Sequence, residues 1–217
     1  MARPLRYLAI EGPIGVGKTS LARRLAETLG FELVLERAEE NPFLERFYRD
    51  PAANALPTQL HFLFQRARQA QEMRQADLFA GGRVADFLLE KDRIFARLTL
   101  PDEEYRLYEQ VYQGLALDAP TPDLVVYLQA PVETLIERVQ RRGIAYEQAV
   151  RPDYLRRLSE AYMDFFHRYD AGPLLIVNAA AIDPVRREAD FRDLLGRIQS
   201  MEGGRQYYNP APFQPGD

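Results

Sequence analysis

Gly12-Pro13-Ile14-Gly15-Val16-Gly17-Lys18-Thr19-Ser20 is the stretch that decides the fold of this chain. Residues 12–19 match the phosphate-binding pattern G-x-x-x-x-G-K-[ST]. Glycines allow such a loop to turn its backbone amides toward a phosphate, the helix that follows adds the positive end of its dipole, and the lysine supplies a mobile charge. We therefore predict a nucleotide phosphate site over residues 12–20, with Lys18 as a catalytic cation and the Thr19 hydroxyl as a ligand of Mg²⁺.

The surroundings of this loop favour a phosphate site over an ordinary glycine-rich turn. An apolar run at 5–10 precedes the loop, and residues 18–29 have helical spacing. Further β-rich runs occupy 31–35, 83–85, 124–128 and 174–177. Helical patterns lie between and after them, at 56–80, 87–97, 102–116, 132–142, 153–169 and 190–199. This alternation predicts an α/β fold with a five-stranded parallel sheet and helices on both faces.

Composition limits the classes to which the chain can belong. Its 217 residues, 47% of them hydrophobic, suit one domain, which we place at 1–202 before a polar tail at 203–217 that we expect to fray or pack peripherally. The absence of cysteine excludes thiolate catalysis. No stretch approaches the roughly 20 apolar residues of a membrane span, and the formal charge of −4 argues against a general nucleic-acid binder. We expect a cytoplasmic protein without membrane or nucleic-acid partners.

A phosphate loop alone leaves open what happens to the nucleotide. Small-molecule kinases, GTPase-type switches and motor or assembly ATPases are the three alternatives. The guanine-reading segment N-K-x-D is absent, which weakens the switch, and the chain is short for a motor ATPase with its own coupling domains. A kinase needs residues for an acceptor, and these can be sought in the sequence.

Two carboxylates stand where acceptor residues are expected. Ligands of open α/β sheets bind beyond the carboxyl ends of the strands. Glu36 directly follows the run at 31–35, and Asp86 directly follows the run at 83–85. One carboxylate can accept a hydrogen bond or a proton from an attacking hydroxyl, while the other helps to bind Mg²⁺ between the phosphates. The alternative for each is that it caps the next helix.

Segments over nearly the whole chain resemble the deoxynucleoside kinase family, especially its bacterial deoxyadenosine and deoxyguanosine kinase branch. They are GPIGVGKTS (12–20), LERAEENPFLERFYRD (35–50), PTQLHFLFQR (57–66), VADFLLEKDRIFA (84–96), ERVQRRGIAYEQ (137–148) and GRQYYNP (204–210). The resemblance implies a P-loop kinase fold with a helical lid at about 138–150. It also implies phosphorylation of the 5′-hydroxyl of a deoxynucleoside by ATP and Mg²⁺ in nucleotide salvage. The branch further implies a purine, deoxyguanosine or deoxyadenosine, and a homodimer.

The resemblance assigns roles in the acceptor pocket. Glu36 looks like the acid near the sugar 5′-hydroxyl, a candidate general base, and Tyr48 like the residue that contacts the sugar 3′-hydroxyl. Gln59 resembles the amide that hydrogen-bonds the base edge, which suits its paired donor and acceptor. Arg66 follows Gln59 by two helical turns and can face the same pocket, with a surface arginine as the alternative. Phe95 can supply an apolar wall, although such aromatic residues also form cores.

The segment at 137–148 resembles the lid of this family, whose arginines close over the phosphates of ATP. Arg138 and Arg142 are four residues apart on one helix face, so both can reach one phosphate cluster. A solvated basic helix end is the alternative. Glu147 resembles the lid acid that meets the sugar 3′-hydroxyl together with Tyr48, which would couple acceptor binding to lid closure.

The chain departs from the family pattern after the second strand-end acid. Relatives often have arginine and serine there, whereas this chain has Asp86-Phe87-Leu88. Lys91 from the next helix and Arg141 from the lid are the candidates to replace the missing cation. Asp92 aligns with an acid that helps to select the base only if one residue is deleted before Ile94.

Two other functions stay open from the sequence. A nucleoside monophosphate kinase, such as one acting on thymidylate, would need further basic residues for the acceptor phosphate. A regulatory module would bind ATP to change its affinity for a partner and would turn ATP over slowly. The preference among adenine, guanine and cytosine is also open, because Gln59 can present either edge of its amide.

Overall fold

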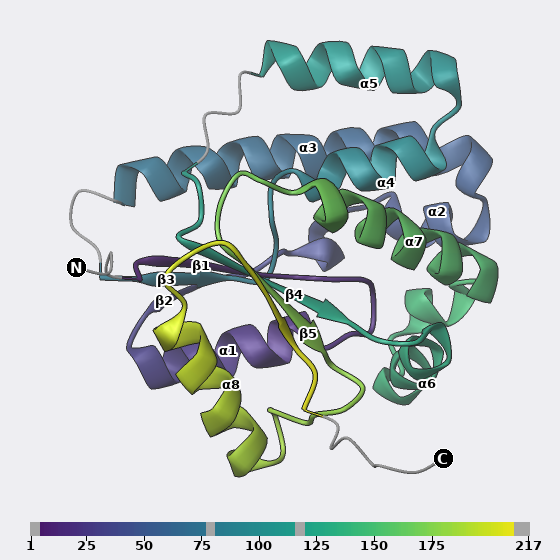
Figure 1. Cartoon of the computed structure of the whole chain (residues 1–217). Coiled ribbons are helices and arrows are strands. Elements are labelled where there is room, and N and C mark those ends of the chain that lie inside the picture. The colour runs from purple at the N-terminus through teal and green to yellow at the C-terminus, as the bar shows by residue number, and fades with distance from the viewer. Residues whose placement is uncertain (1–4, 77–80, 116–119, 211–217) are drawn as a thin grey trace.

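The computed structural model of the chain describes residues 5–76, 81–115 and 120–210. Six strands within these ranges form a parallel sheet in the order β2-β3-β1-β4-β5-β6 (Figure 1). The strands are β1 Tyr7–Glu11, β2 Glu32–Val34, β3 Arg83–Ala85, β4 Leu124–Gln129, β5 Leu174–Asn178 and β6 Arg205–Tyr208. The predicted α/β fold with a parallel sheet is therefore confirmed.

The predicted number of five strands was wrong, because β6 lies in the segment for which we expected a peripheral tail. Its sequence RQYY is short and contains no apolar run that would indicate a strand. Only Tyr208 among its residues is buried. Pairing with β5, from Leu174 beside Arg205 to Val177 beside Tyr208, adds it to the edge of the sheet. The rest of the predicted tail, from 211, lies outside the described residues.

The helices agree with the predicted segments, with differences at their ends. They are α1 Lys18–Leu29, α2 Leu44–Arg49, α3 Pro51–Ala76, α4 Lys91–Thr99, α5 Asp102–Gly114, α6 Val132–Arg142, α7 Pro152–Arg168 and α8 Glu188–Ser200. We did not predict α2, and the ends predicted at 80 and 116 lie outside the described residues. α4 begins later than predicted, because Lys91 and Asp92 donate their backbone N–H groups to carbonyls three residues back, of Leu88 and Leu89, in turns that precede the helix.

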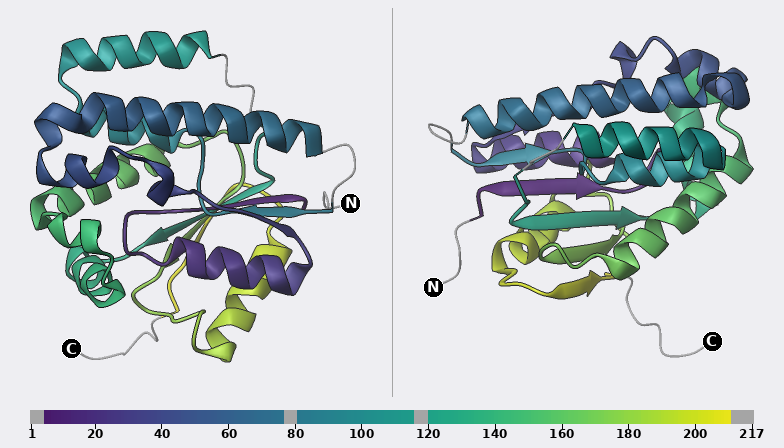
Figure 2. Two further views of the ribbon diagram at one scale, coloured as in Figure 1. Left: turned by 180° about the vertical axis from the view of Figure 1, so that it is seen from behind. Right: turned by 90° about the horizontal axis from the view of Figure 1, so that it is seen from above.

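Helices cover both faces of the sheet, as predicted (Figure 2). α1 and α8 enclose one core, which includes Leu8, Leu21 and Leu194. α4 and α7 enclose the other core, which includes Ala9 and Phe166. Successive residues of β1 belong to opposite cores, because side chains along a strand point alternately to the two faces of the sheet. Within the described ranges, no helix has the length and apolar character needed to cross a bilayer.

The sheet order creates a crevice at the end of β1. β1 lies between β3 and β4, so the chain builds the sheet outward from β1 in both directions. Such a switch point leaves a binding crevice beyond the carboxyl ends of the strands. The loop before α1 leaves β1 at this edge, and the segments after β2 and β3 leave at the same edge because the three strands are parallel. The topology therefore brings Lys18, Glu36 and Asp86 to one crevice.

We predict that Tyr208 is needed for stability although it lies in the polar C-terminal segment. Its ring is 4% exposed in the core that contains Leu194, and its hydroxyl donates to Asp193. Tyr208→Ala should lower the free energy of unfolding by about 3–5 kcal/mol, because it empties a buried aromatic site. Tyr207 is 67% exposed, so Tyr207→Ala should change this free energy by less than about 0.5 kcal/mol. Urea unfolding measures both, and equal effects would contradict a structural role of β6.

Candidate functional site

At Gly12 and Gly15, the phosphate-binding loop combines a backbone conformation that favours glycine with a close approach of other backbone atoms. Gly12 has a φ of 147° and Gly15 a φ of 84°. A Cβ at Gly12 would lie 2.3 Å from the carbonyl oxygen of Leu128, and one at Gly15 would lie 2.8 Å from that of Leu135. No side chain caps the first turn of α1. The amides of this turn are therefore available to an anion, as the sequence pattern predicts.

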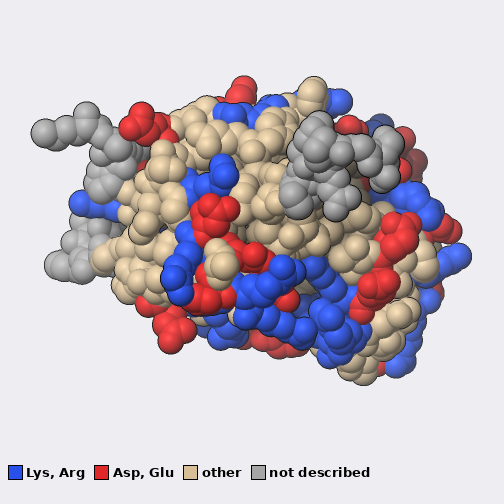
Figure 3. Space-filling view, turned by 60° about the horizontal axis from the view of Figure 1, so that its bottom comes forward, with Lys and Arg blue, Asp and Glu red and all other residues tan. Residues whose placement is uncertain are grey.

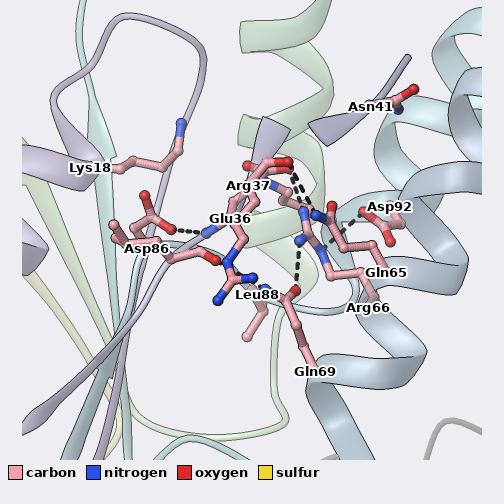
Figure 4. A network of polar contacts seen from close by, with 12 residues as sticks. Lys18, Glu36, Arg37, Asn41, Gln65, Arg66, Gln69, Asp86, Leu88 and Asp92 are labelled. Carbon is pink, nitrogen blue, oxygen red and sulfur yellow. Dashed lines mark hydrogen bonds and ion pairs between the residues drawn. The ribbon is translucent and has the colours of Figure 1, made fainter. Parts of the chain in front are cut away.

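Lys18 is the first residue of α1, and its side chain extends beside the loop (Figure 4). Its Nζ donates to the carbonyl oxygens of Gly12, over 2.7 Å, and Pro13, over 3.2 Å. Burial lowers the pKa of Lys18 from its ordinary value, while Glu11 acts in the opposite direction. The ammonium group is held over the loop by two neutral acceptors, which a phosphate oxygen can replace.

Thr19 and Asp86, the predicted metal ligands, are in contact. Thr19 Oγ1 donates to Asp86 Oδ2 over 2.5 Å, and Asp86 Oδ1 accepts from the backbone N–H of Glu36 over 2.7 Å. Hydroxyl and carboxylate oxygens are donors that Mg²⁺ prefers, and Mg²⁺ on a nucleotide needs only one or two carboxylates beside the phosphates. This oxygen pair fits Mg²⁺. Elsewhere in the described part of the chain, no group of three or more His, Cys, Asp or Glu could hold a metal ion.

Glu36 follows β2 and lies between two cations. Its Oε1 accepts from Nη2 of Arg66 on α3 (Figure 4), and its Oε2 accepts from Nζ of Lys91 on α4. Burial by itself would raise the pKa of Glu36, but the charges of Lys91 and Arg66 outweigh it and hold this pKa far below its ordinary value. Glu36 is therefore an ionised hydrogen-bond acceptor, and its side chain is engaged with cations and not with a helix end.

Arg66 is fully buried, so the alternative of a surface arginine was wrong. Its Nη1 donates to Gln69 Oε1 over 3.1 Å, and its Nε lies 3.5 Å from Asp92 Oδ1. The guanidinium carbon also lies 4.3 Å from the centroid of the Phe87 ring. Arg66 is therefore held by residues from four parts of the chain: the end of β2, the segment after β3, α3 and α4.

Asp92 lies on α4 beside Arg66 and has one free oxygen. The residue is 3% exposed, and Oδ2 has no hydrogen-bond partner among the residues that the structure describes. Burial raises the pKa of Asp92 to about 6, although the positive charge of Arg66 partly opposes the shift. A buried carboxylate with a free oxygen can accept a hydrogen bond from a bound molecule.

A cavity of about 600 Å³ opens between the phosphate-binding loop, α3, α4 and the segment after α6. The predicted acceptor residues on its wall are Glu36, Tyr48, Gln59, Asp92, Phe95 and Glu147. Lys18, Thr19 and Asp86 line the same cavity. Arg66 is absent from this lining, but it contacts Glu36 and Asp92, which are part of it. The predicted phosphate and acceptor residues therefore share one space.

The segment predicted as a lid, about 138–150, comprises the end of α6 and a 3-10 helix, η2 (Ala145–Ala149). Arg142 binds Glu147 at two points, with Nε 2.9 Å from Oε2 and Nη2 bonded to Oε1. Arg138 donates to the backbone carbonyls of Val16, over 3.0 Å, and Ala179, over 2.8 Å. Both arginines contact protein groups, while the Arg142 side chain remains 45% exposed, and their action on phosphates stays a prediction.

A second, basic cavity of about 430 Å³ lies on the other side of the loop. Its wall includes residues 15–21 and the basic side chains of Arg138, Arg141, Arg142 and Arg186. Apolar Ile182 and Val185 also line it. Figure 3 shows that basic side chains gather on part of one face with acidic side chains beside them. The positive charge is therefore local, although the chain carries a formal charge of −4.

Glu11 was missed in the sequence, although it joins the loop to the segment after β3. It is fully buried, and it accepts hydrogen bonds from the backbone N–H of Gly12, over 2.6 Å, and of Leu88, over 3.0 Å. Glu11 is the last residue of β1. The rule of strand-end acids that identified Glu36 and Asp86 could therefore have identified it too.

Tyr146 also received no role from the sequence. Its ring lies parallel to that of Tyr48, with an angle of 4° between the planes and 6.2 Å between the centroids. Both rings line the larger cavity. The pair connects α2, which we did not predict, with η2 in the lid region, and it closes the cavity on the side of the predicted sugar contacts.

Comparisons with known proteins agree with this geometry. A family model described as deoxynucleoside kinase matches residues 8–201. Deoxyguanosine kinase of Bacillus subtilis is 32% identical over 90% of this chain and 97% of its own length. Deoxyadenosine/deoxycytidine kinase of the same organism is 27% identical over 89% and 92%, respectively. Deoxyadenosine kinase of Dictyostelium discoideum is 32% identical over 97% of this chain and 86% of its own.

Solved structures show the same fold. Deoxyadenosine kinase of M. mycoides, with the products dCMP and a flexible dCDP bound, superposes with a TM-score of 0.79 at 27% identity. The match covers 90% of this chain and all of the other chain. The arrangement of strands and helices that forms the crevice is therefore shared over almost the full length.

We predict that Asp92 makes stability depend on pH in a defined direction. Its pKa rises from 3.8 to about 6 on folding, so the folded chain binds this proton more tightly than the unfolded chain. The resulting stabilisation is complete below 3.8 and is lost as the pH rises through about 6. Relative to Asp92→Asn, the wild type should lose free energy of unfolding between about pH 4 and about pH 7. Urea unfolding at several pH values measures this, and a constant difference between the two proteins would contradict it.

Proposed function

The chain belongs to the deoxynucleoside kinase family, and on this premise we propose that it transfers the γ-phosphoryl group of ATP to the 5′-hydroxyl of a purine deoxynucleoside. The main support for the proposal is the shared cavity of about 600 Å³. The phosphate-binding residues Lys18 and Thr19 and the carboxylate residue Glu36 all line it. A donor phosphate and an acceptor hydroxyl can meet in such a space without a covalent intermediate.

The donor half of the proposal rests on the loop and the second cavity. The loop amides, the first turn of α1 and Lys18 would bind the phosphates of ATP. The basic wall with Arg138, Arg141 and Arg142 lies directly beside the loop and would counter the remaining phosphate charge. Thr19 and Asp86 would hold Mg²⁺, which when bound neutralises charge on the phosphates.

The acceptor half rests on the surroundings of Glu36. The ionised carboxylate would accept a hydrogen bond from the 5′-hydroxyl and align its oxygen with the γ-phosphorus. The new bond forms between this oxygen and phosphorus while the bond to the β-phosphate oxygen breaks, ADP leaves, and the hydroxyl proton passes to Glu36 or to solvent. Tyr48 on α2 and Glu147 in η2, which both line the cavity, would bind the sugar 3′-hydroxyl.

The base would lie against Gln59 and Asp92, with Phe95 beside it. Gln59 can pair with a base edge that has one donor and one acceptor, and the free Oδ2 of Asp92 can accept from a base amino or imino group. Adenine and guanine both present such edges. The names of deoxyguanosine kinase of Bacillus subtilis and deoxyadenosine kinase of Dictyostelium discoideum support a purine, whereas the name of the second relative from Bacillus subtilis also includes deoxycytidine. Family resemblance also supports a cytoplasmic homodimer that acts in nucleotide salvage.

A panel of acceptors tests the function. We expect ATP turnover with Mg²⁺ in the presence of deoxyguanosine or deoxyadenosine, and a reduction of kcat by about 10²–10⁴ in Glu36→Gln, which removes the charge that aligns the hydroxyl. A coupled assay with the four deoxynucleosides, their ribose counterparts and the four deoxynucleoside monophosphates measures this. Turnover with monophosphates alone would point to a monophosphate kinase. Turnover that no acceptor stimulates would point to a regulatory module.

Lys18 provides a separate test of the donor site. Lys18→Ala should lower kcat about a hundredfold, or roughly 3 kcal/mol of transition-state stabilisation, because it removes a charge that acts on the transferring group. Arg49→Ala is a control on the surface, since its side chain is 72% exposed and pairs with Glu45. Steady-state kinetics measures both variants. A loss below about tenfold for Lys18→Ala would contradict its role.

A further inference from the structure

Lys18 and Lys91 are the only two lysines in the sequence, in which every other basic residue except the two histidines is arginine. Both line the cavity of about 600 Å³. Lysine differs from arginine in having a compact charge with three hydrogen-bond donors on one rotating ammonium group.

Lys91 contacts two carboxylates from different strand ends, Glu11 at the end of β1 and Glu36 after β2. Its Nζ is bonded to Oε2 of Glu36 and lies 3.9 Å from Oε1 of Glu11, and its side chain is only 5% exposed. Glu11 in turn accepts the backbone N–H of Gly12, the first residue of the phosphate-binding loop. A continuous chain of polar contacts thus runs from the loop through Glu11 and Lys91 to Glu36.

Among the described residues, the other candidate cations have different contacts and do not take the place of Lys91. The residue after the strand-end acid is Phe87, which is fully buried beneath the guanidinium of Arg66. Arg141, the other candidate from the sequence, lines the second cavity and is absent from the lining of the first. Arg66 binds the other oxygen of Glu36. It also donates to Gln69 and lies beside Asp92.

We propose that Lys91 is a positioning residue that holds the Glu36 carboxylate in register with the phosphate-binding loop during transfer. The inference rests on the proposed function and deepens it. Each oxygen of Glu36 has two lone pairs, and Arg66 and Lys91 take one on each oxygen. The carboxylate keeps free lone pairs for the acceptor hydroxyl but cannot rotate. Without Lys91, Glu36 is held from one side only and the link to the loop is broken.

Substitution of Lys91 tests the proposal in the full-length protein. We expect Lys91→Met to lower kcat about a hundredfold, because misplacement of a reacting group by about 1 Å has this effect, while the KM values for ATP and deoxynucleoside change less than about threefold. Lys91→Arg should fall between wild type and Lys91→Met, because it keeps the charge. Arg97→Met on the same helix is the control, since Arg97 is 64% exposed and pairs with Asp102. Unchanged kcat in Lys91→Met would overturn the proposal.

A double-mutant cycle shows whether Lys91 acts through Glu36. In the Glu36→Gln background, Lys91→Met should lower kcat less than about threefold further, because the group that it positions has already lost its charge. An undiminished effect in that background would overturn the proposal. Wild-type turnover with deoxynucleosides is measured first and tests the proposed function by itself. A failure of the proposed function is therefore distinguished from a failure of the proposed role of Lys91.

The presence of only two lysines allows a test that needs no activity. Protein labelled at the lysine side chains should give two ammonium or Cε signals by NMR, and Lys91→Arg identifies the one from Lys91. Glu36→Gln should shift the Lys91 signal strongly, because the bonded partner of its Nζ loses its charge. The same experiment serves if Lys91→Met does not fold. A Lys91 signal that Glu36→Gln leaves unchanged would overturn the contact on which the proposal depends.

Discussion

The pairing of one partly buried carboxylate with two buried cations is the constraint on which the rest of the site depends. Removing an unpaired charge from water costs several kcal/mol, so buried ions must find partners at the same time. Glu36 meets this condition with Arg66 and Lys91, and Arg66 meets Asp92 in turn. The requirement fixes α3 and α4 against the end of β2. The wall of the cavity is therefore set by charge pairing, while the two apolar cores support the sheet beneath it.

The fold could be predicted from local signals, except where those signals are weak. The loop at 12–19 and the apolar runs predicted the parallel sheet. The limits of α1 and α6 were predicted to the residue, and the end of each helix is marked by a glycine in the left-handed region, Gly30 and Gly143. The strand at Arg205–Tyr208 was missed because only one of its residues is buried. The start of α4 was misplaced because turns with hydrogen bonds to the carbonyls of Leu88 and Leu89 occupy the segment before Lys91.

The residues of the site were easier to predict than their partners. Spacing and resemblance indicated Thr19, Asp86 and Glu36, and the fold places all three in one cavity. The bond between Lys91 and Glu36 joins residues 55 positions apart on different elements. Arg138 likewise reaches the carbonyl of Ala179, which only the neighbouring position of β4 and β5 explains. Such contacts depend on which elements meet in space, and periodicity contains no information about that.

The strong acidity of Glu36 has a consequence for the order of events in phosphoryl transfer. A carboxylate stabilised by two cations is a poor proton acceptor, whereas a sugar hydroxyl is a very weak acid until its oxygen bonds to phosphorus. On the proposed mechanism, the proton therefore leaves late, after the oxygen has begun to share its electrons with the phosphoryl group. Glu36 would direct the trajectory of the oxygen more than it would increase its nucleophilicity. This order suits a loose transition state, in which little bonding to the acceptor precedes departure of ADP.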